Sequence, residues 1–148
     1  MQEPIEVETV KDAPAGERVP KAAFEVAAKG AVLVDAESGE VLFEQDAHKE
    51  LPLASVTKVM TMLLVMEAVD SGKITLDDSV TISERAASMG GSQMYMEAGE
   101  THTVAELMEG VAMASANDGC VALSEFVAGS EEIFVERMNE RAAELGMR

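Results

Sequence analysis

The sequence has 148 residues, enough for one ordinary domain, and 47% of them are hydrophobic, so a packed core can form. The formal net charge of -17 repels phosphate backbones and anionic lipid headgroups, which argues against nucleic acid and membrane surfaces as partners. The single cysteine, Cys120, excludes an internal disulfide.

The first 22 residues carry prolines and a glycine among charged side chains, and this composition predicts a flexible lead-in over residues 1–22, followed by a folded region over 23–148. No signal peptide is visible, since the chain starts on acidic residues without an apolar h-region. The longest apolar stretch, 59–69, is shorter than the about 20 residues that a transmembrane helix needs. The chain as given is therefore expected to make no membrane contact.

Two β-type runs follow the lead-in. Ala31–Asp35 and Val41–Glu44 flank a glycine-containing turn, which predicts a β-hairpin. A strong helix is predicted next, over 54–71, with Pro52 at its start and Gly72 as its stop. Its residues are apolar or small on nearly all sides, so we expect it to be buried all round.

The second half of the chain is predicted to be mainly helical. Residues 80–82 are typical of a short strand, and Thr103 with Glu106 forms a capping box that starts a helix ending near Ser115. A further helix is expected to start near Asn117 and run to about residue 127. A last helix spans roughly 130–145. Because a two-stranded sheet is marginal alone, the pattern indicates part of a larger mixed α/β fold.

Ser55 and Lys58 stand at the start of the first predicted helix. Their i, i+3 spacing places both side chains on one face, and unpaired N–H groups at a helix N-terminus stabilise an oxyanion formed there. A lysine among apolar residues loses hydration, which favours the free amine that can take the Ser55 proton. Most S-x-x-K tetrapeptides hold only a helix-capping serine and a solvated lysine, so the motif alone leaves both interpretations open.

Ser115 and Asn117 lie at a break between two predicted helices. A hydroxyl there can relay a proton, and an amide can hold a substrate carbonyl and a lysine together. Serine and asparagine are also common helix caps, so this triplet carries little weight alone. His48 and His102 have no ligands at metal-site spacing, and Cys120 is best interpreted as a buried thiol.

Together these elements resemble the active-site serine penicillin-recognising enzymes, whose signatures are S-x-x-K, S-x-N or S-D-N, and K-T-G. The resemblance covers about residues 24–148. Further segments are similar to the D-alanyl-D-alanine carboxypeptidases in particular: 31–42, 51–61, 90–96, 99–100, 115–118, 128–131 and 138–139. The resemblance implies the mixed α/β (α+β) penicillin-binding-protein/β-lactamase-like transpeptidase fold, here its N-terminal β-hairpin and mainly helical lobe.

The resemblance also implies the roles of four residues. Ser55 would be the acylated nucleophile, with its N–H as one half of the oxyanion hole, and Lys58 the general base. Ser115 would relay protons, and Asn117 would bind substrate and orient Lys58. No metal and no organic cofactor is implied.

One signature is missing, because no K-T-G occurs in the sequence. In the family this strand supplies the second oxyanion N–H and the cation that holds the substrate carboxylate. The family's C-terminal β-domain and anchoring helix are also not found. The chain is therefore expected to be a truncated catalytic domain, and the 148-residue chain to have little or no activity.

The function expected from the resemblance is a serine carboxypeptidase that trims peptidoglycan stem peptides ending in D-Ala-D-Ala and that β-lactam antibiotics also acylate. It would act outside the bacterial cytoplasmic membrane. A class A-type β-lactamase is an alternative, but such enzymes carry Asp where Ala116 stands, and no segment resembles their deacylating loop. The other alternative is a non-catalytic fragment or interaction module.

Overall fold

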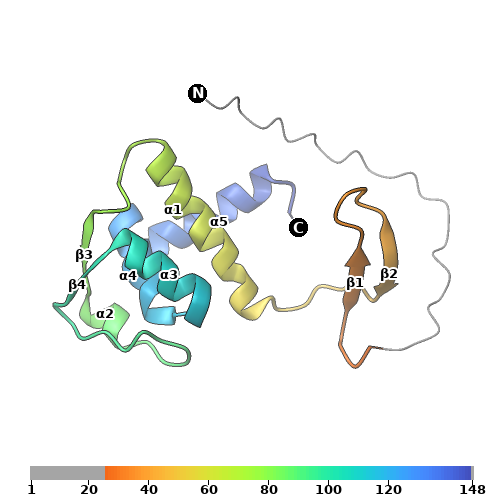
Figure 1. Ribbon diagram of the computed structural model, residues 1–148, viewed down its shortest axis with the longest axis horizontal. Helices are drawn as coiled ribbons and strands as arrows, with labels where there is room; N and C mark the ends of the chain where they lie inside the picture. The colour runs from red at the N-terminus through yellow and green to blue at the C-terminus, as the bar shows by residue number, and fades with distance from the viewer. Residues whose placement is uncertain (1–25, 148) are drawn as a thin grey trace. The chain divides into compact units, whose positions relative to one another are not determined.

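The computed structural model describes residues 26–147 (Figure 1). The chain divides into two compact units, the first ending at Pro52 and the second starting at Leu53. The lead-in predicted for residues 1–22 lies outside the described residues.

The first unit is built around a β-hairpin. Strand β1 (Ala31–Val34) pairs with β2 (Val41–Gln45) in antiparallel register, as the sequence predicts. The turn is held by the Asp35 carboxylate, which accepts hydrogen bonds from the N–H and the hydroxyl of Ser38 at 2.8 and 2.7 Å. Gly39 takes the left-handed conformation at φ 72° that the turn requires.

The second unit is mainly helical, with one small antiparallel sheet. Strand β3 (Ser79–Thr81) pairs with β4 (Thr101–Thr103). In chain order, the helices are η1 (Ala54–Thr57, a 3₁₀-helix), α1 (Lys58–Asp70), α2 (Glu84–Ala87), α3 (Val104–Ala114), α4 (Asn117–Ala128) and α5 (Glu131–Glu144). The mixed α/β class and the three long C-terminal helices agree with the prediction.

Local sequence signals explain where these helices begin and end. Thr103 and Glu106 form both hydrogen bonds of the predicted capping box on α3. Ser130 caps α5 by accepting from the N–H of Ile133. Gly72 and Gly129, at φ 71° and 89°, follow the ends of α1 and α4 in the left-handed conformation.

Helix α4 is the centre of the second unit and contacts α1, α2, α3, α5 and β3 (Figure 1). The fully buried core packs around it and includes Phe134, Leu123, Leu107 and Val65. Because α4 is held from several sides, its N-terminus is fixed relative to α1 and α3. The residues proposed for chemistry stand at that N-terminus and at the start of α1.

The prediction for the helix over 54–71 was wrong in two respects. Its first turn is the 3₁₀-helix η1, and α1 is buried on one face only, through Thr61, Val65 and Ala68. The other face is apolar but open: Val56 and Val59 are 63% and 60% exposed. Hydrophobic composition on all sides shows that a helix can be buried, but the neighbours present in the described residues cover one side.

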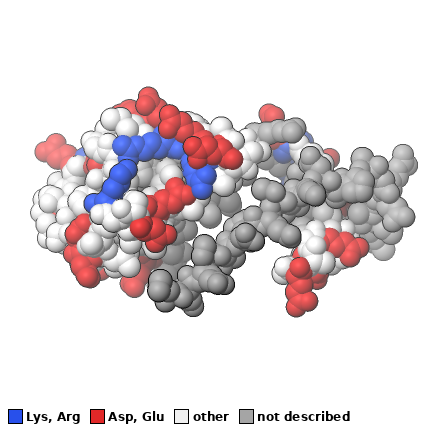
Figure 2. Space-filling model, turned by 90° about the horizontal axis from the view of Figure 1, so that it is seen from above, with Lys and Arg blue, Asp and Glu red and all other residues white. Residues whose placement is uncertain are grey.

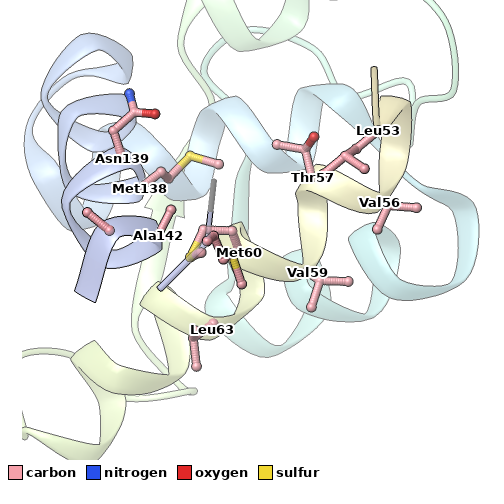
Figure 3. A pocket seen from close by; sticks show the side chains of 11 residues that line it. Leu53, Val56, Thr57, Val59, Met60, Leu63, Met138, Asn139 and Ala142 are labelled. Carbon is pink, nitrogen blue, oxygen red and sulfur yellow. The ribbon is translucent and has the colours of Figure 1, made fainter. Parts of the chain in front are cut away.

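The open face of η1 and α1 forms one wall of an apolar groove of about 610 Å³ (Figure 3). Met60 and Leu63 lie on this wall, and Met138 and Ala142 of α5 lie on the opposite one. Neither Ser55 nor Lys58 lines the groove. It is therefore distinct from the cluster of polar side chains described next.

Candidate active site

Ser55 lies in η1, directly after a residue with an unusual backbone. Ala54 has φ 48°, a left-handed conformation that is costly for a residue with a Cβ. Such strain of order 1–3 kcal/mol is found at functional sites more often than elsewhere. Ser55 is exposed, and its N–H donates to no atom of residues 26–147, so it is free to bind an oxyanion.

Lys58 is the centre of the cluster. Its Nζ lies 3.2 Å from Ser55 Oγ and 3.0 Å from Ser115 Oγ, within hydrogen-bond distance of both. Lys58 is half-buried, and none of the ion pairs within residues 26–147 includes it. Two hydroxyls that stand 60 positions apart in the sequence therefore meet at one amine.

Ser115 reaches Lys58 because of its place between α3 and α4. It is the C-cap of α3 and takes the left-handed conformation at φ 54° and ψ 41°. The next residue, Ala116, is fully buried, which leaves no room for a large side chain between the two helices. The tight turn thus directs the Ser115 hydroxyl to the start of α1.

Asn117 begins α4 and is bound to a distant segment rather than to Lys58. Its side-chain Nδ2 donates to the Gly90 carbonyl at 2.6 Å, and its backbone N–H donates to the Ser92 carbonyl at 2.8 Å. Among the described residues, Asn117 forms no hydrogen bond with Lys58. Its assigned role of orienting the lysine stays a prediction.

Asp118 is a functional candidate that the sequence analysis did not single out. Its side chain is buried, and its carboxylate accepts hydrogen bonds from the N–H groups of Met94 and Tyr95. A carboxylate in the first turn of a helix was the only signal in the sequence. The segment that it holds lies 23 and 24 positions earlier in the sequence and could not be identified from that signal.

The cluster has the three groups that a nucleophile, a general base and a proton relay would need: two hydroxyls and one amine within hydrogen-bond distance. When Lys58 is a free amine, its lone pair can accept the Ser55 proton across the 3.2 Å separation. Ser115 Oγ, 3.0 Å from the same Nζ, can pass that proton onward. Both transfers are within the reach required for general acid–base chemistry.

Cys120 lies one turn along α4 from this cluster. Burial raises the pKa of its thiol from 9.0 to about 11, although the positive charge of Lys58 and a hydrogen bond with Thr61 act in the opposite direction. The thiolate is the reactive form, so a raised pKa makes this cysteine inert near neutral pH. The interpretation of Cys120 as a plain buried thiol agrees with this environment.

We predict that Cys120 alkylates slowly with iodoacetamide. At pH 8 its thiolate fraction should be about 100-fold below that of an ordinary thiol, and its rate should keep rising about tenfold per pH unit toward pH 11. The matched control is the same chain in denaturant, where the rate should level off near pH 9. Equal rates for the folded and unfolded chains at pH 8 would contradict the prediction.

The two histidines lie in different units, and each has an acidic side chain nearby. His48 is 3.9 Å from Glu44, and His102 is 3.6 Å from Glu100. Within residues 26–147, no three or more His, Cys, Asp or Glu side chains are grouped so that they could hold a metal ion.

No helix in that part of the chain is long and apolar enough to cross a membrane. Acidic side chains are spread widely over the face seen in Figure 2, around one band of basic side chains.

Comparison with known proteins gives the same family as the sequence resemblance. The family model described as D-alanyl-D-alanine carboxypeptidase matches residues 16–148. The chain is 52% identical over 133 residues to the D-alanyl-D-alanine carboxypeptidase DacF of Bacillus subtilis, covering 90% of this chain and 34% of the relative. The chain thus spans about a third of the length of the curated relatives that it matches.

Solved structures show the same relationship. Penicillin binding protein 5 from Haemophilus influenzae matches with a TM-score of 0.79 and 35% identity, over 86% of this chain and 38% of that one. Penicillin-binding protein D2 from Listeria monocytogenes, solved in the ampicillin-bound form, matches with a TM-score of 0.74 and 30% identity, over 86% of this chain and 50% of that one. The chain therefore belongs to the D-alanyl-D-alanine carboxypeptidase family.

Proposed function

We propose that the protein carrying this chain is a serine-type D-Ala-D-Ala carboxypeptidase that trims peptidoglycan stem peptides through an acyl-Ser55 intermediate. The observation that supports this most directly is Lys58 Nζ within hydrogen-bond distance of both Ser55 Oγ and Ser115 Oγ. A serine paired with a lysine base is a recognised activated nucleophile. We place the activity outside the cytoplasmic membrane, where peptidoglycan lies.

The proposed reaction has two stages, acylation of Ser55 and hydrolysis of the acyl-enzyme. Ser55 gives its proton to Lys58 as its Oγ forms a bond to the carbonyl carbon of the penultimate D-alanine, and the Ser55 N–H faces the developing oxyanion. The peptide C–N bond then breaks, and the proton returns through Lys58 and Ser115 to the leaving amine of the terminal D-alanine. Water hydrolyses the resulting ester and restores the Ser55 hydroxyl.

β-Lactams are proposed as a second class of acylating agent. Attack by Ser55 on the lactam carbonyl breaks the ring C–N bond, but the leaving nitrogen stays attached to the acyl group. The ampicillin-bound form of the Listeria monocytogenes relative supports this proposal. Asn117 is proposed to bind the amide groups that both classes of substrate present.

The class A-type β-lactamase is the weaker hypothesis. Ala116, fully buried between α3 and α4, stands where those enzymes carry Asp in the S-D-N triplet. The relatives reported above are named carboxypeptidases and penicillin-binding proteins. The hypothesis of a non-catalytic module is decided by the experiment below.

We expect penicillin to form one covalent adduct with the intact protein that carries this sequence, on the peptide containing Ser55. Intact-mass analysis and peptide mapping give the number and place of adducts. Ser55→Ala should abolish labelling, whereas Ser71→Ala, a change of the same kind beyond the other end of α1, should preserve it. An adduct on Ser115 or Cys120 would refute the assignment, and no adduct at all would favour the non-catalytic module.

A further inference from the structure

The segment 90–96 has no regular secondary structure, yet it is fixed to the start of α4. It runs between α2 and β4, where the backbone N–H groups cannot pair in a helix or sheet. Such groups need other partners when they are buried. The Asp118 carboxylate supplies them: its oxygens lie 3.0 Å from the N–H groups of Met94 and Tyr95 and 3.5 Å from that of Met96.

A buried carboxylate is costly without compensation, and within residues 26–147 the hydrogen bonds to the Asp118 carboxylate all come from backbone N–H groups. The side chain is 1% exposed, and the N–H of Gly119 adds a further hydrogen bond of 2.9 Å. Asp118 also stands in the first turn of α4, where the helix dipole favours negative charge. Its role is therefore to join α4 to this segment, and no cation is needed to explain its burial.

The same segment orients the side chain of Asn117. Its amide reaches the Gly90 carbonyl, and a carbonyl can only accept, so the group that faces Gly90 must be the NH₂. The amide oxygen is then left without a hydrogen-bond partner among the described residues. Gly91 keeps the contact close, because a Cβ at that position would lie 2.9 Å from Asn117 Nδ2.

We propose that Asp118 is a positioning residue that acts through Asn117. The Asp118 carboxylate holds the segment 90–96 and so fixes the position of the Gly90 carbonyl. Because this carbonyl binds the NH₂ of Asn117, the Asn117 amide oxygen is left to face the bound substrate. This inference rests on the proposed function, in which Asn117 binds substrate amides. Asp118 itself touches neither Ser55 nor Lys58 through any hydrogen bond of the described residues.

The test is a double-mutant cycle on the rate of Ser55 acylation by penicillin, measured in the intact protein that carries this sequence. Asp118→Asn keeps the size of the side chain but places an NH₂ against backbone donors, which releases the segment. We expect about 10²-fold slower acylation, the loss typical of misplaced binding groups. In an Asn117→Ala background, the same change should cost less than about threefold, because the residue through which it acts is gone.

A matched control and a second variant make the cycle decisive. Asp78→Asn alters another carboxylate that holds a backbone N–H, that of Thr75, away from the cluster, and should leave acylation unchanged. Gly91→Ala, at an exposed position, should disturb Asn117 directly and also be non-additive with Asn117→Ala, so it decides the question if Asp118→Asn fails to fold.

The outcomes separate this inference from the proposed function. Losses that multiply in the double variants, while the unmodified protein is acylated on Ser55, would overturn the role of Asp118 and leave the proposed function intact. An unmodified protein without a Ser55 adduct would overturn the proposed function and this inference with it. Non-additive losses for Asp118→Asn, or for Gly91→Ala where the first variant does not fold, would support the positioning role.

Discussion

Lys58→Arg should slow acylation of Ser55 by at least about 10²–10⁴-fold, the range typical for loss of a general base. The positive charge is retained in this variant, but arginine does not lose its proton near neutral pH. It cannot therefore accept the proton of the Ser55 hydroxyl, which lies 3.2 Å from Lys58 Nζ. A planar guanidinium would also be too large for a position shared between the Ser55 and Ser115 hydroxyls.

The measurement is the rate of covalent labelling with a fluorescent penicillin, followed over time at saturating and subsaturating concentrations. Lys73→Arg is the matched control, since Lys73 is exposed beyond the C-terminus of α1 and contacts the helix through its backbone. It should label at the normal rate. Near-normal labelling of Lys58→Arg would show that Lys58 acts only as a positive charge, and the base role would be wrong.

The elements that could be predicted are those fixed by nearby residues. The hairpin follows from two β-rich runs around Gly39, and α3 and α5 follow from caps at Thr103 and Ser130. Strand β4 was missed because its three residues form a strand only through pairing with β3, some 20 positions away. The short helix α2 was missed for a different reason, since four residues give too little periodicity to detect.

Burial could be predicted only in part, because it depends on neighbours that the sequence does not place. The apolar residues of α1 indicate a buried helix, but the packing of α3, α4 and α5 covers only the face carrying Val65 and Ala68. The hairpin shows the same limit, since Val32 and Leu33 remain 57% and 53% exposed. Apolar composition gives the capacity for burial and not the side on which it occurs.

The candidate site could be predicted where chemistry requires particular residue types at fixed spacing. Ser55 and Lys58 are one turn apart, so their proximity follows from local geometry. The meeting of Ser115 with Lys58 depends on the left-handed turn between α3 and α4, and only the family resemblance indicated it. The expected inactivity of the 148-residue chain stays a prediction, as do the roles of Ser55, Lys58, Ser115 and Asn117.

Ser115 offers the second large effect, because its hydroxyl and its backbone can be separated by experiment. Ser115→Ala removes the hydroxyl that lies 3.0 Å from Lys58 Nζ and keeps the Cβ. Ser115→Gly also removes the hydroxyl but relaxes the left-handed backbone at φ 54°. If the hydroxyl relays the proton, both variants should acylate about 10²–10⁴-fold more slowly, and by similar factors.

Stability should distinguish the two variants where activity does not. Because a Cβ in the left-handed region costs roughly 1–2 kcal/mol, Ser115→Gly should have the higher free energy of unfolding in a urea titration. Ser88→Ala is the matched control: Ser88 is the C-cap of α2, with an ordinary backbone at φ -80°, and its loss should not slow acylation. Normal acylation by Ser115→Gly together with slow acylation by Ser115→Ala would mean that the reaction requires the backbone of the turn and not the Ser115 hydroxyl. The proton would then have to pass through Lys58 alone.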